Sequence, residues 1–476
     1  MVRIRRSIRG VDTALAVAVL APAVFTPVSA RANVFEIFGA GARSQAMAGA
    51  VTATATDFGA VWHNPAGLAY APDSASFGMT GAFDRTSILL APRPQGYDPT
   101  GYGLRLNERR DTDKQGSLFG VTLGLTMKLV SDDLRIGFLV YMPSDGFAHA
   151  AGAFPDEREQ YFDNRLHYEL LGERLRSEIM AAGLGYRLAD WLSLGFGMKM
   201  LQSNETVTRV YTPNAADPSK VYMATGLQQQ TGGALIAGAM VQPWPFLRIG
   251  LSFHDELAFK IKGESEVQIR GQESEDDYPL VQPIRQVQHA SVPRFGFGAA
   301  YTGDAWTAGL DATYEIWSRY PSVTGDLAHL KNTYSVSGGF EYELRKGTHL
   351  RSGLGWHPSP VPDQTGRTNF VDNNRIVASL GAGNAFKLWE RNFEANLGVQ
   401  VQALLARETV KHVANHAPVC DASARSLCDE VPDSKVDTPV LPAADTVGLQ
   451  TGNPGFPGFS SGGYILTAGL DVRWLF

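Results

Sequence analysis

The sequence predicts an all-β protein, a transmembrane antiparallel β-barrel of about fourteen strands with an N-terminal hatch in its lumen. Three observations predict this class. The chain ends on a strand with one apolar and one polar face, it begins with a secretory signal, and between them it repeats pairs of alternating segments joined by tight turns. Beyond the signal, no stretch of eighteen apolar residues suggests a membrane-spanning helix.

The C-terminal strand is the clearest of these signals. Its alternate residues are all apolar, with aromatic rings at both ends: Tyr464, Leu466, Ala468, Leu470, Val472, Trp474 and Phe476. The other parity is mostly polar or small, as in Arg473, Asp471 and Thr467. Because a strand shows alternate residues to opposite faces, one face suits lipid and the other water. An aromatic C-terminus resembles the end that the barrel-assembly machinery reads, so this machinery and outer-membrane lipid are expected partners.

The N-terminus indicates export. Arg3, Arg5, Arg6 and Arg9 precede an apolar run over 14–25, and Ala30-Arg31-Ala32 follows. This pattern predicts a signal peptide over 1–32 with cleavage after Ala32. The segment holds five Lys/Arg and one Asp, so its removal changes the net charge from −6 to −10. An acidic mature chain argues against a nucleic-acid partner.

The barrel itself is predicted over 73–476. The run 118–129 is apolar at odd positions, and after a short polar turn the run 134–142 is apolar at even positions, which indicates a hairpin. The pattern recurs around five more tight turns, and long polar connections are expected between the hairpins, at 91–115, 147–173, 213–222, 264–285, 321–329, 358–372 and 412–461. Short periplasmic turns and long extracellular loops are typical of outer-membrane barrels. Fourteen strands place both chain ends on the periplasmic side.

Residues 33–72 do not alternate. They are rich in Gly and Ala, poor in charge, and contain the run Asn64-Pro65-Ala66-Gly67-Leu68. Disorder favours the opposite composition, whereas small residues allow close packing inside a wide barrel. We expect a hatch in the lumen, with gating residues Phe35, Phe38, Asn64, Pro65, Ala66 and Gly67.

The hatch carries a family resemblance. Residues 39–43, 47–50 and 64–68 are similar to the hatch of FadL-type outer-membrane long-chain fatty acid transporters, and further similar motifs lie at 161–164, 167–169, 190–195, 317–318, 359–363 and Asp372. The resemblance implies a monomeric barrel that takes up hydrophobic molecules passively. It also implies that extracellular loops capture the ligand, that a lumenal pocket receives it, and that it leaves sideways into the membrane beside a kinked strand.

The sequence departs from the family pattern at two points. His63 stands where many relatives have an aromatic residue, and no motif places the basic pair that would hold a fatty-acid carboxylate. Strand parity directs Arg294 and Arg351 to the lumen, and Arg319 lies near a loop end, so these three are candidates for the ligand's polar head. The ligand is therefore a fatty acid or a neutral or aromatic hydrocarbon.

A lateral opening is expected near Pro143 and Gly146, which follow the alternating run 134–142. Proline cannot donate to a strand ladder and glycine weakens it, so both mark a break in the sheet. The alternative is that Pro143 simply ends the strand at the rim. The resemblance favours the opening.

Other motifs indicate neither catalysis nor a cofactor. The run 458–462 matches Gly-x-Ser-x-Gly, but no His follows Ser460, as the hydrolase order requires. The acidic run 273–277 is expected to be a solvated loop tip rather than a cation site. We therefore expect no enzyme and no bound metal.

The two cysteines, Cys420 and Cys428, are expected to form a disulfide, because oxidation is the default outside the cytoplasm. The alternative is a zinc site that they share with His412 and His416.

Two functions follow from these observations. The first is passive outer-membrane transport of a hydrophobic small molecule, and the alternative is a structural or adhesive barrel that binds a partner through its long loops. An adhesin does not need a plug of small residues, and an open solute porin would not contain one, so the hatch favours transport.

Overall fold

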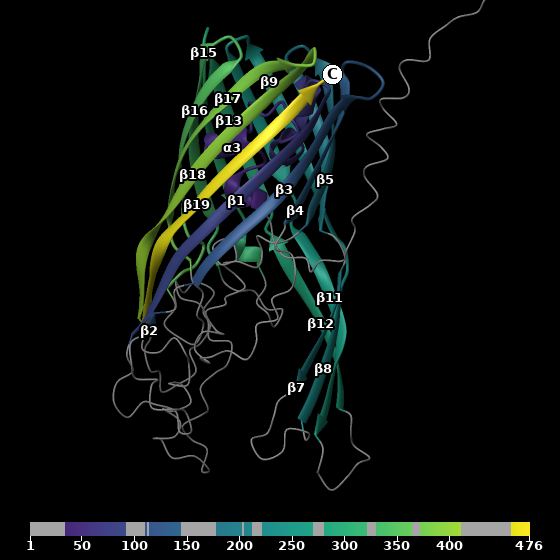
Figure 1. The fold of residues 1–476 in the computed structure, drawn as a ribbon, viewed down its shortest axis with the longest axis vertical. Coiled ribbons are helices and arrows are strands. Elements are labelled where there is room, and N and C mark those ends of the chain that lie inside the picture. The colour runs from purple at the N-terminus through teal and green to yellow at the C-terminus, as the bar shows by residue number, and fades with distance from the viewer. Residues whose placement is uncertain are drawn as a thin grey trace, which may run out of the picture.

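The computed structural model describes residues 34–91, 110–111, 114–143, 178–201, 204–211, 221–269, 280–320, 330–363, 372–410 and 458–476. Most of these residues form one antiparallel barrel (Figure 1). Its sheet has fifteen strands, of which β2 (Arg110–Asp111) pairs only with two residues of β1. The other strands are β1 (Ser74–Leu90), β3 (Lys114–Lys128), β4 (Leu134–Pro143), β5 (Ile179–Ala189), β6 (Leu192–Leu201), β9 (Gly232–Trp244), β10 (Leu247–His254), β13 (Arg294–Thr302), β14 (Trp306–Glu315), β15 (Thr333–Arg345), β16 (Thr348–His357), β17 (Arg375–Leu388), β18 (Arg391–Val410) and β19 (Gly458–Leu475).

The first and last of these fourteen strands close the barrel. β1 pairs with β19 along its whole length, from Ser74 opposite Leu475 to Leu90 opposite Phe459. The start of β1 and the end of β19 therefore lie at the same rim, where the short turns also lie (Figure 1). The predicted count of fourteen strands and the common side of both ends are confirmed.

The strands alternate as a membrane barrel requires. In β19, Tyr464 and Leu470 are 49% and 47% exposed on the outer wall, whereas their neighbours Ile465 and Asp471 are 1% and 4% exposed. An outer wall of large apolar side chains with a partly polar interior suits lipid outside and a filled lumen inside. Among the described residues, no helix has the length and apolar character to cross a membrane.

Four barrel strands continue past the long-loop rim as a separate four-stranded sheet (Figure 1). Its strands are β7 (Asn204–Tyr211), β8 (Val221–Gln229), β11 (Leu257–Ile269) and β12 (Leu280–Ser291). The expectation of a loop over the whole of 264–285 is wrong, because strand pairing continues through most of it. These strands contain many polar residues, a composition that is typical of loops. Outside a membrane, polar strands can nevertheless pair.

Residues 34–71 lie inside the barrel and are called the inner segment here (Figure 1). They form α2 (Val34–Phe38), α3 (Ala42–Ala46), α4 (Ala60–His63) and the 3-10 helix η1 (Pro65–Tyr70). Most of the side chains are buried. α3 contacts β16 to β19, while η1 contacts β4, β5, β6 and β9, so the segment reaches opposite sides of the lumen.

Candidate ligand site in the barrel lumen

Glycines of the wall allow the inner segment to approach the strands closely. A Cβ on Gly195 of β6 would lie 2.1 Å from the backbone nitrogen of Ala66, and a Cβ on Gly353 of β16 would lie 2.4 Å from the carbonyl carbon of Met47. No real side chain fits at such distances. The small residues of the segment are thus matched by glycines in the strands, and this positions the site.

Two buried carboxylates of the wall accept backbone hydrogen bonds from the segment. Asp311 of β14 accepts from Thr52 N at 2.8 Å, and Asp471 of β19 accepts from Ala42 N at 2.7 Å. A carboxylate is a strong acceptor for a backbone N–H, so each bond fixes one point of the segment to the barrel.

Asn64 provides a third anchor. Its amide nitrogen donates to Thr52 O at 2.9 Å and to Ala239 O of β9 at 3.2 Å, and its side-chain oxygen accepts from Ala66 N at 3.1 Å. The residue is fully buried. The side chain therefore joins two parts of the segment to the wall and begins η1.

Arg43 gives a charged anchor. Its guanidinium lies 3.1 Å from Glu341 of β15, and the same carboxylate oxygen pairs with Arg351 of β16 at 2.5 Å. Arg351 also donates to Asn396 at 2.7 Å. Two cations thus share one carboxylate, and Arg351 is occupied by the wall residues Glu341 and Asn396.

His63 joins α4 to the start of α3. Its Nε2 lies 3.1 Å from Ala40 N and 2.8 Å from the Ser44 hydroxyl. The backbone N–H of Ala40 only donates, so Nε2 is the unprotonated nitrogen and the ring is neutral. Burial, and then the nearby cations Arg294 and Arg43, lower the pKa of His63 to about 3.

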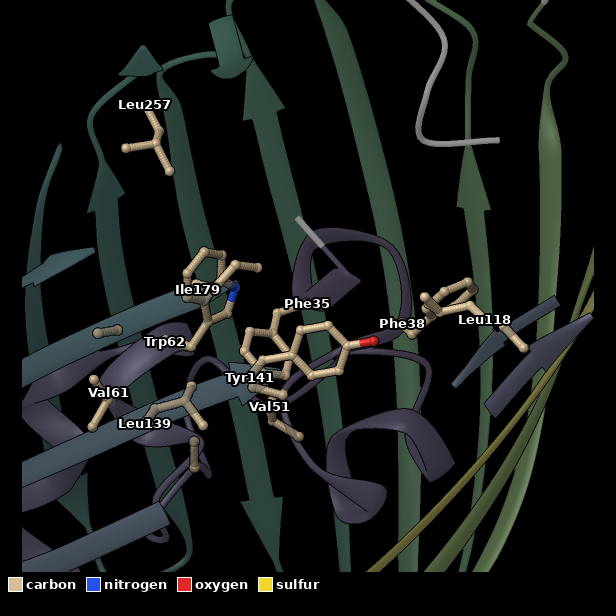
Figure 2. Close-up of a cluster of buried hydrophobic side chains, with 14 of the residues drawn as sticks. Phe35, Phe38, Val51, Val61, Trp62, Leu118, Leu139, Tyr141, Ile179 and Leu257 are labelled. Atoms are coloured by element: carbon tan, nitrogen blue, oxygen red, sulfur yellow. The ribbon is translucent and has the colours of Figure 1, made fainter. Parts of the chain in front are cut away.

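A cluster of aromatic rings lies between the inner segment and the wall (Figure 2). The ring of Phe35 from α2 lies 5.6 Å from Trp62 of α4 and 5.4 Å from Tyr141 of β4. Trp62 lies in turn 6.0 Å from His254 of β10. All four side chains are nearly or fully inaccessible to solvent. This arrangement suits an apolar ligand.

A basic pair borders these rings. Lys199 of β6 and Arg294 of β13 lie over the ring of Trp62, at 5.4 and 5.8 Å from its centroid. Both approach the same oxygen of Glu36, at 3.4 and 3.6 Å. Lys199 also donates to Ser291 at 2.9 Å, and Arg294 lies 3.3 Å from Nδ1 of His254. The cluster thus combines an apolar wall with two cations and one carboxylate.

A cavity of about 90 Å³ lies beside this cluster and is lined by Phe35, Glu36, Trp62, His254 and Arg294, among others. An apolar groove of about 590 Å³ lies on the outer wall over the same strands, rimmed by Phe253, Phe295 and Tyr334. Ser252, Gly296 and Thr313 line both spaces. A thin part of the wall therefore separates the lumenal site from the membrane side.

The sequence-predicted ligand candidates have different places. Arg294 lies in the site, Arg351 is paired with Glu341, and Arg319 is exposed at the long-loop rim, in the short helix η4 (Trp317–Arg319). The sequence does not single out Lys199 and Glu36 as residues of the site. Parity alone places Lys199 toward the lumen, but nothing in the sequence indicates its partner.

The residues expected to gate the hatch are buried within the inner segment. Phe35 is in the ring cluster, Phe38 is 1% exposed, and 64–67 pack against β5, β6 and β9. Pro143 is buried, ends β4 and pairs with Gly120, whose inner side is covered by Tyr141. These positions leave the gating and opening roles as predictions.

Several predicted sites lie outside the described residues. They are the signal peptide over 1–32, Gly146, the acidic run, and the loop that carries Cys420, Cys428 and the two histidines. Ser460 lies within β19 and pairs with β1 and β18, not at a strand-to-helix turn. In the described parts of the chain, no three His, Cys, Asp or Glu side chains gather as metal ligands.

A closed barrel of fourteen strands, apolar outside and filled inside, defines an outer-membrane β-barrel protein. The model of one protein family, outer membrane protein transport protein (OMPP1/FadL/TodX), matches residues 173–412, which are 240 of the 476 residues. The chain therefore belongs to this family. The predicted family and the outer-membrane location are confirmed. No curated protein matches the chain significantly.

Solved structures share the fold. A Pseudomonas aeruginosa FadL homologue is 15% identical, with a TM-score of 0.57, over 95% of this chain and 100% of its own. A TodX deltaS2S3 mutant, described as a monoaromatic hydrocarbon channel, is 12% identical, with a TM-score of 0.53, over 92% of this chain and 99% of its own. At these identities the likeness concerns the fold alone.

Proposed function

We propose that the barrel carries a hydrophobic small molecule, a long-chain fatty acid or an aromatic hydrocarbon, passively across the outer membrane. The observation that carries this proposal is the buried cluster of Phe35, Trp62 and Tyr141 between the inner segment and the wall. Apolar surface of this kind binds apolar ligands and excludes water. In this proposal the extracellular loops capture the ligand, and the barrel works as a monomer without enzymatic activity or cofactor.

The inner segment acts as the hatch. It meets the wall on opposite sides of the lumen and is held by the buried anchors Asp311, Asp471 and Asn64. Such a seal prevents free diffusion of polar solutes. A transient displacement near α2 would then open the route only when a ligand occupies the site.

The ligand leaves sideways near the end of β4. Tyr141 is part of the ring cluster, and Pro143 lies two residues further along the same strand. The ring cluster therefore lies close to Pro143, beside which the opening is proposed.

Uptake by whole cells tests the proposal. We would measure entry of labelled hexadecanoate and toluene into Gram-negative cells that lack other such transporters. Wild-type protein should accelerate entry, and Trp62→Ala should reduce it severalfold because the site loses its central ring. Trp389→Ala, at a turn residue that is 85% exposed, serves as the matched control. Equal uptake with and without the wild-type protein would reject transport.

A partner-binding role is the alternative, and the four-stranded sheet beyond the long-loop rim favours it. Its edge strands β7 and β12 each pair on one side only in the described structure. If the barrel is an adhesin, truncating this sheet should abolish adhesion. Loss of uptake upon truncation would instead assign the sheet to ligand capture.

A further inference from the structure

We infer that Glu36 occupies the head-group position of the lumenal site and sets its preference between anionic and neutral ligands. The inference rests on the proposed transport function. It names the ligand class that competes with Glu36, an amphiphile with a terminal carboxylate. Phe35 and Glu36 together have this chemistry, an apolar group next to a carboxylate.

The contacts of Glu36 are those of a loosely bound anion. One of its oxygens lies 3.4 Å from Lys199 and 3.6 Å from Arg294, whereas well-formed charge-assisted bonds are about 2.7–2.9 Å long. Elsewhere in the barrel, Arg135 and Asp73 reach 2.7 Å. A free carboxylate that enters the site can approach the two cations more closely than Glu36 does.

The cations need an anion. Lys199 is fully buried and Arg294 is 13% exposed, and a buried charge without a partner is strongly unfavourable. Nδ1 of His254 faces the Arg294 guanidinium, which only donates, so this nitrogen is unprotonated and the ring is neutral. Asp255, at the end of β10, adds a further carboxylate that acts on Lys199 at longer range. Glu36 is therefore the direct counterion of the pair.

A third donor lies in the same cluster. The indole N–H of Trp62 is buried and has no hydrogen-bond acceptor among the described residues. Its ring contacts Phe35 and lies below both cations. A carboxylate headgroup has more donors available here than Glu36 uses.

The size of the cavity indicates displacement. Its volume is about 90 Å³, whereas ligand pockets usually measure roughly 300–1,000 Å³. A long-chain ligand therefore fits only if Phe35 and Glu36 move. α2 is short, and Gln402 of β18 joins it to the wall by donating to Ile37 O at 2.9 Å.

The consequence is selectivity. While Glu36 is in place, its carboxylate balances one of the two positive charges, so a neutral ligand meets less uncompensated charge than it would without Glu36. An anionic ligand must compete with a tethered carboxylate. Replacing Glu36 by an uncharged residue should therefore favour anionic ligands over neutral ligands of the same length.

Equilibrium binding of hexadecanoate and 1-hexadecanol to purified protein in neutral detergent tests the inference. Glu36→Gln should strengthen hexadecanoate binding about tenfold, because one nearby negative charge is removed from a poorly hydrated site. Hexadecanol binding should stay within about twofold of the wild type. Glu390→Gln, in the exposed turn after β17, is the matched control and should change neither affinity.

Arg294→Gln gives a second, independent arm. Added to Glu36→Gln, it should remove the gain in hexadecanoate affinity and leave hexadecanol binding unchanged. Heat-modifiable migration on gels verifies that each variant has a folded barrel. Unchanged or weaker hexadecanoate binding in folded Glu36→Gln overturns the inference, as does an equal gain for both ligands. If the wild type binds neither ligand, the inference fails, and the proposed function keeps only aromatic hydrocarbons as ligands.

Discussion

The backbone N–H of Ala42 donates a 2.7 Å hydrogen bond to the buried carboxylate of Asp471. This bond joins the first part of the inner segment to the strand that closes the barrel. The lumen is therefore filled by a segment that precedes every barrel strand in the chain but is fixed to the last. Stability of the closed barrel and docking of the segment are coupled through such contacts.

The Asn64 anchor should control the seal. Asn64→Ala leaves Thr52 O, Ala239 O and Ala66 N without their side-chain partner. Each unpaired buried group costs about 1–3 kcal/mol, so the segment should undock part of the time. Planar-bilayer recordings should show frequent openings to small ions. Asn332→Ala, at an exposed position, is the control. If Asn64→Ala shows no more channel openings than the wild type, this role of Asn64 is refuted.

Close approach at Gly195 should tolerate no side chain. In Gly195→Ala the new Cβ would lie 2.1 Å from Ala66 N, so η1 must shift, at a cost of about 1–3 kcal/mol. Hydrogen exchange followed by mass spectrometry should show faster exchange over 60–70. In Gly81→Ala the nearest atom is 3.8 Å away, and exchange should be unchanged. Equal protection in both variants would contradict the close packing.

Acid should weaken docking through His63. Its pKa is about 3 in the folded protein, below the ordinary value of 6.5, so the unfolded or undocked form binds the proton more tightly. The stabilisation is complete above pH 6.5 and is lost as the pH falls towards 3, by roughly 2 kcal/mol at pH 5.

Ion conductance should therefore rise between pH 7.5 and pH 5 in the wild type. His63→Gln, whose amide does not titrate, should have a smaller pH response. A pH response of the same size in both proteins would assign the effect to other groups.

A cross-link beside β4 should block lateral release. Val121 and Met142 face each other across β3 and β4. A disulfide between cysteines at these positions should lower hydrophobic uptake at least tenfold and leave surface binding intact. The same cross-link at Leu354 and Ala378, across β16 and β17, should leave uptake unchanged. Uptake that survives the first cross-link would contradict release beside β4 and favour release through the wall at Gly296.

Much of the barrel could be predicted from sequence because its determinants are local. Alternation in 464–476 and in the hairpin over 118–142 depends only on strand geometry and on lipid outside the wall. The four-stranded sheet beyond the rim could not be predicted in the same way. It lies outside the membrane constraint, so strands such as 257–269 need no apolar face and resemble polar loops.

The site was only partly predictable. Strand parity directs both Arg294 and Arg351 inward, and both side chains do lie there. Only the fold shows that Arg351 forms an ion pair with Glu341 and is therefore not free for a ligand. The pairing of Glu36 with Lys199 joins residues 163 positions apart. It depends on barrel closure and on docking of a segment without periodicity, so no local pattern indicates it.

Crystal structures with brominated ligands test the central claim, that hydrophobic molecules bind inside this barrel. Bromine scatters X-rays anomalously, so bound 16-bromohexadecanoate and bromobenzene can be distinguished from detergent molecules in the electron density. The account predicts bromine peaks in the lumen, near Phe35, Trp62 and Tyr141, with α2 displaced in the hexadecanoate complex. Peaks found only on the outer wall, with the ring cluster unchanged, would contradict it.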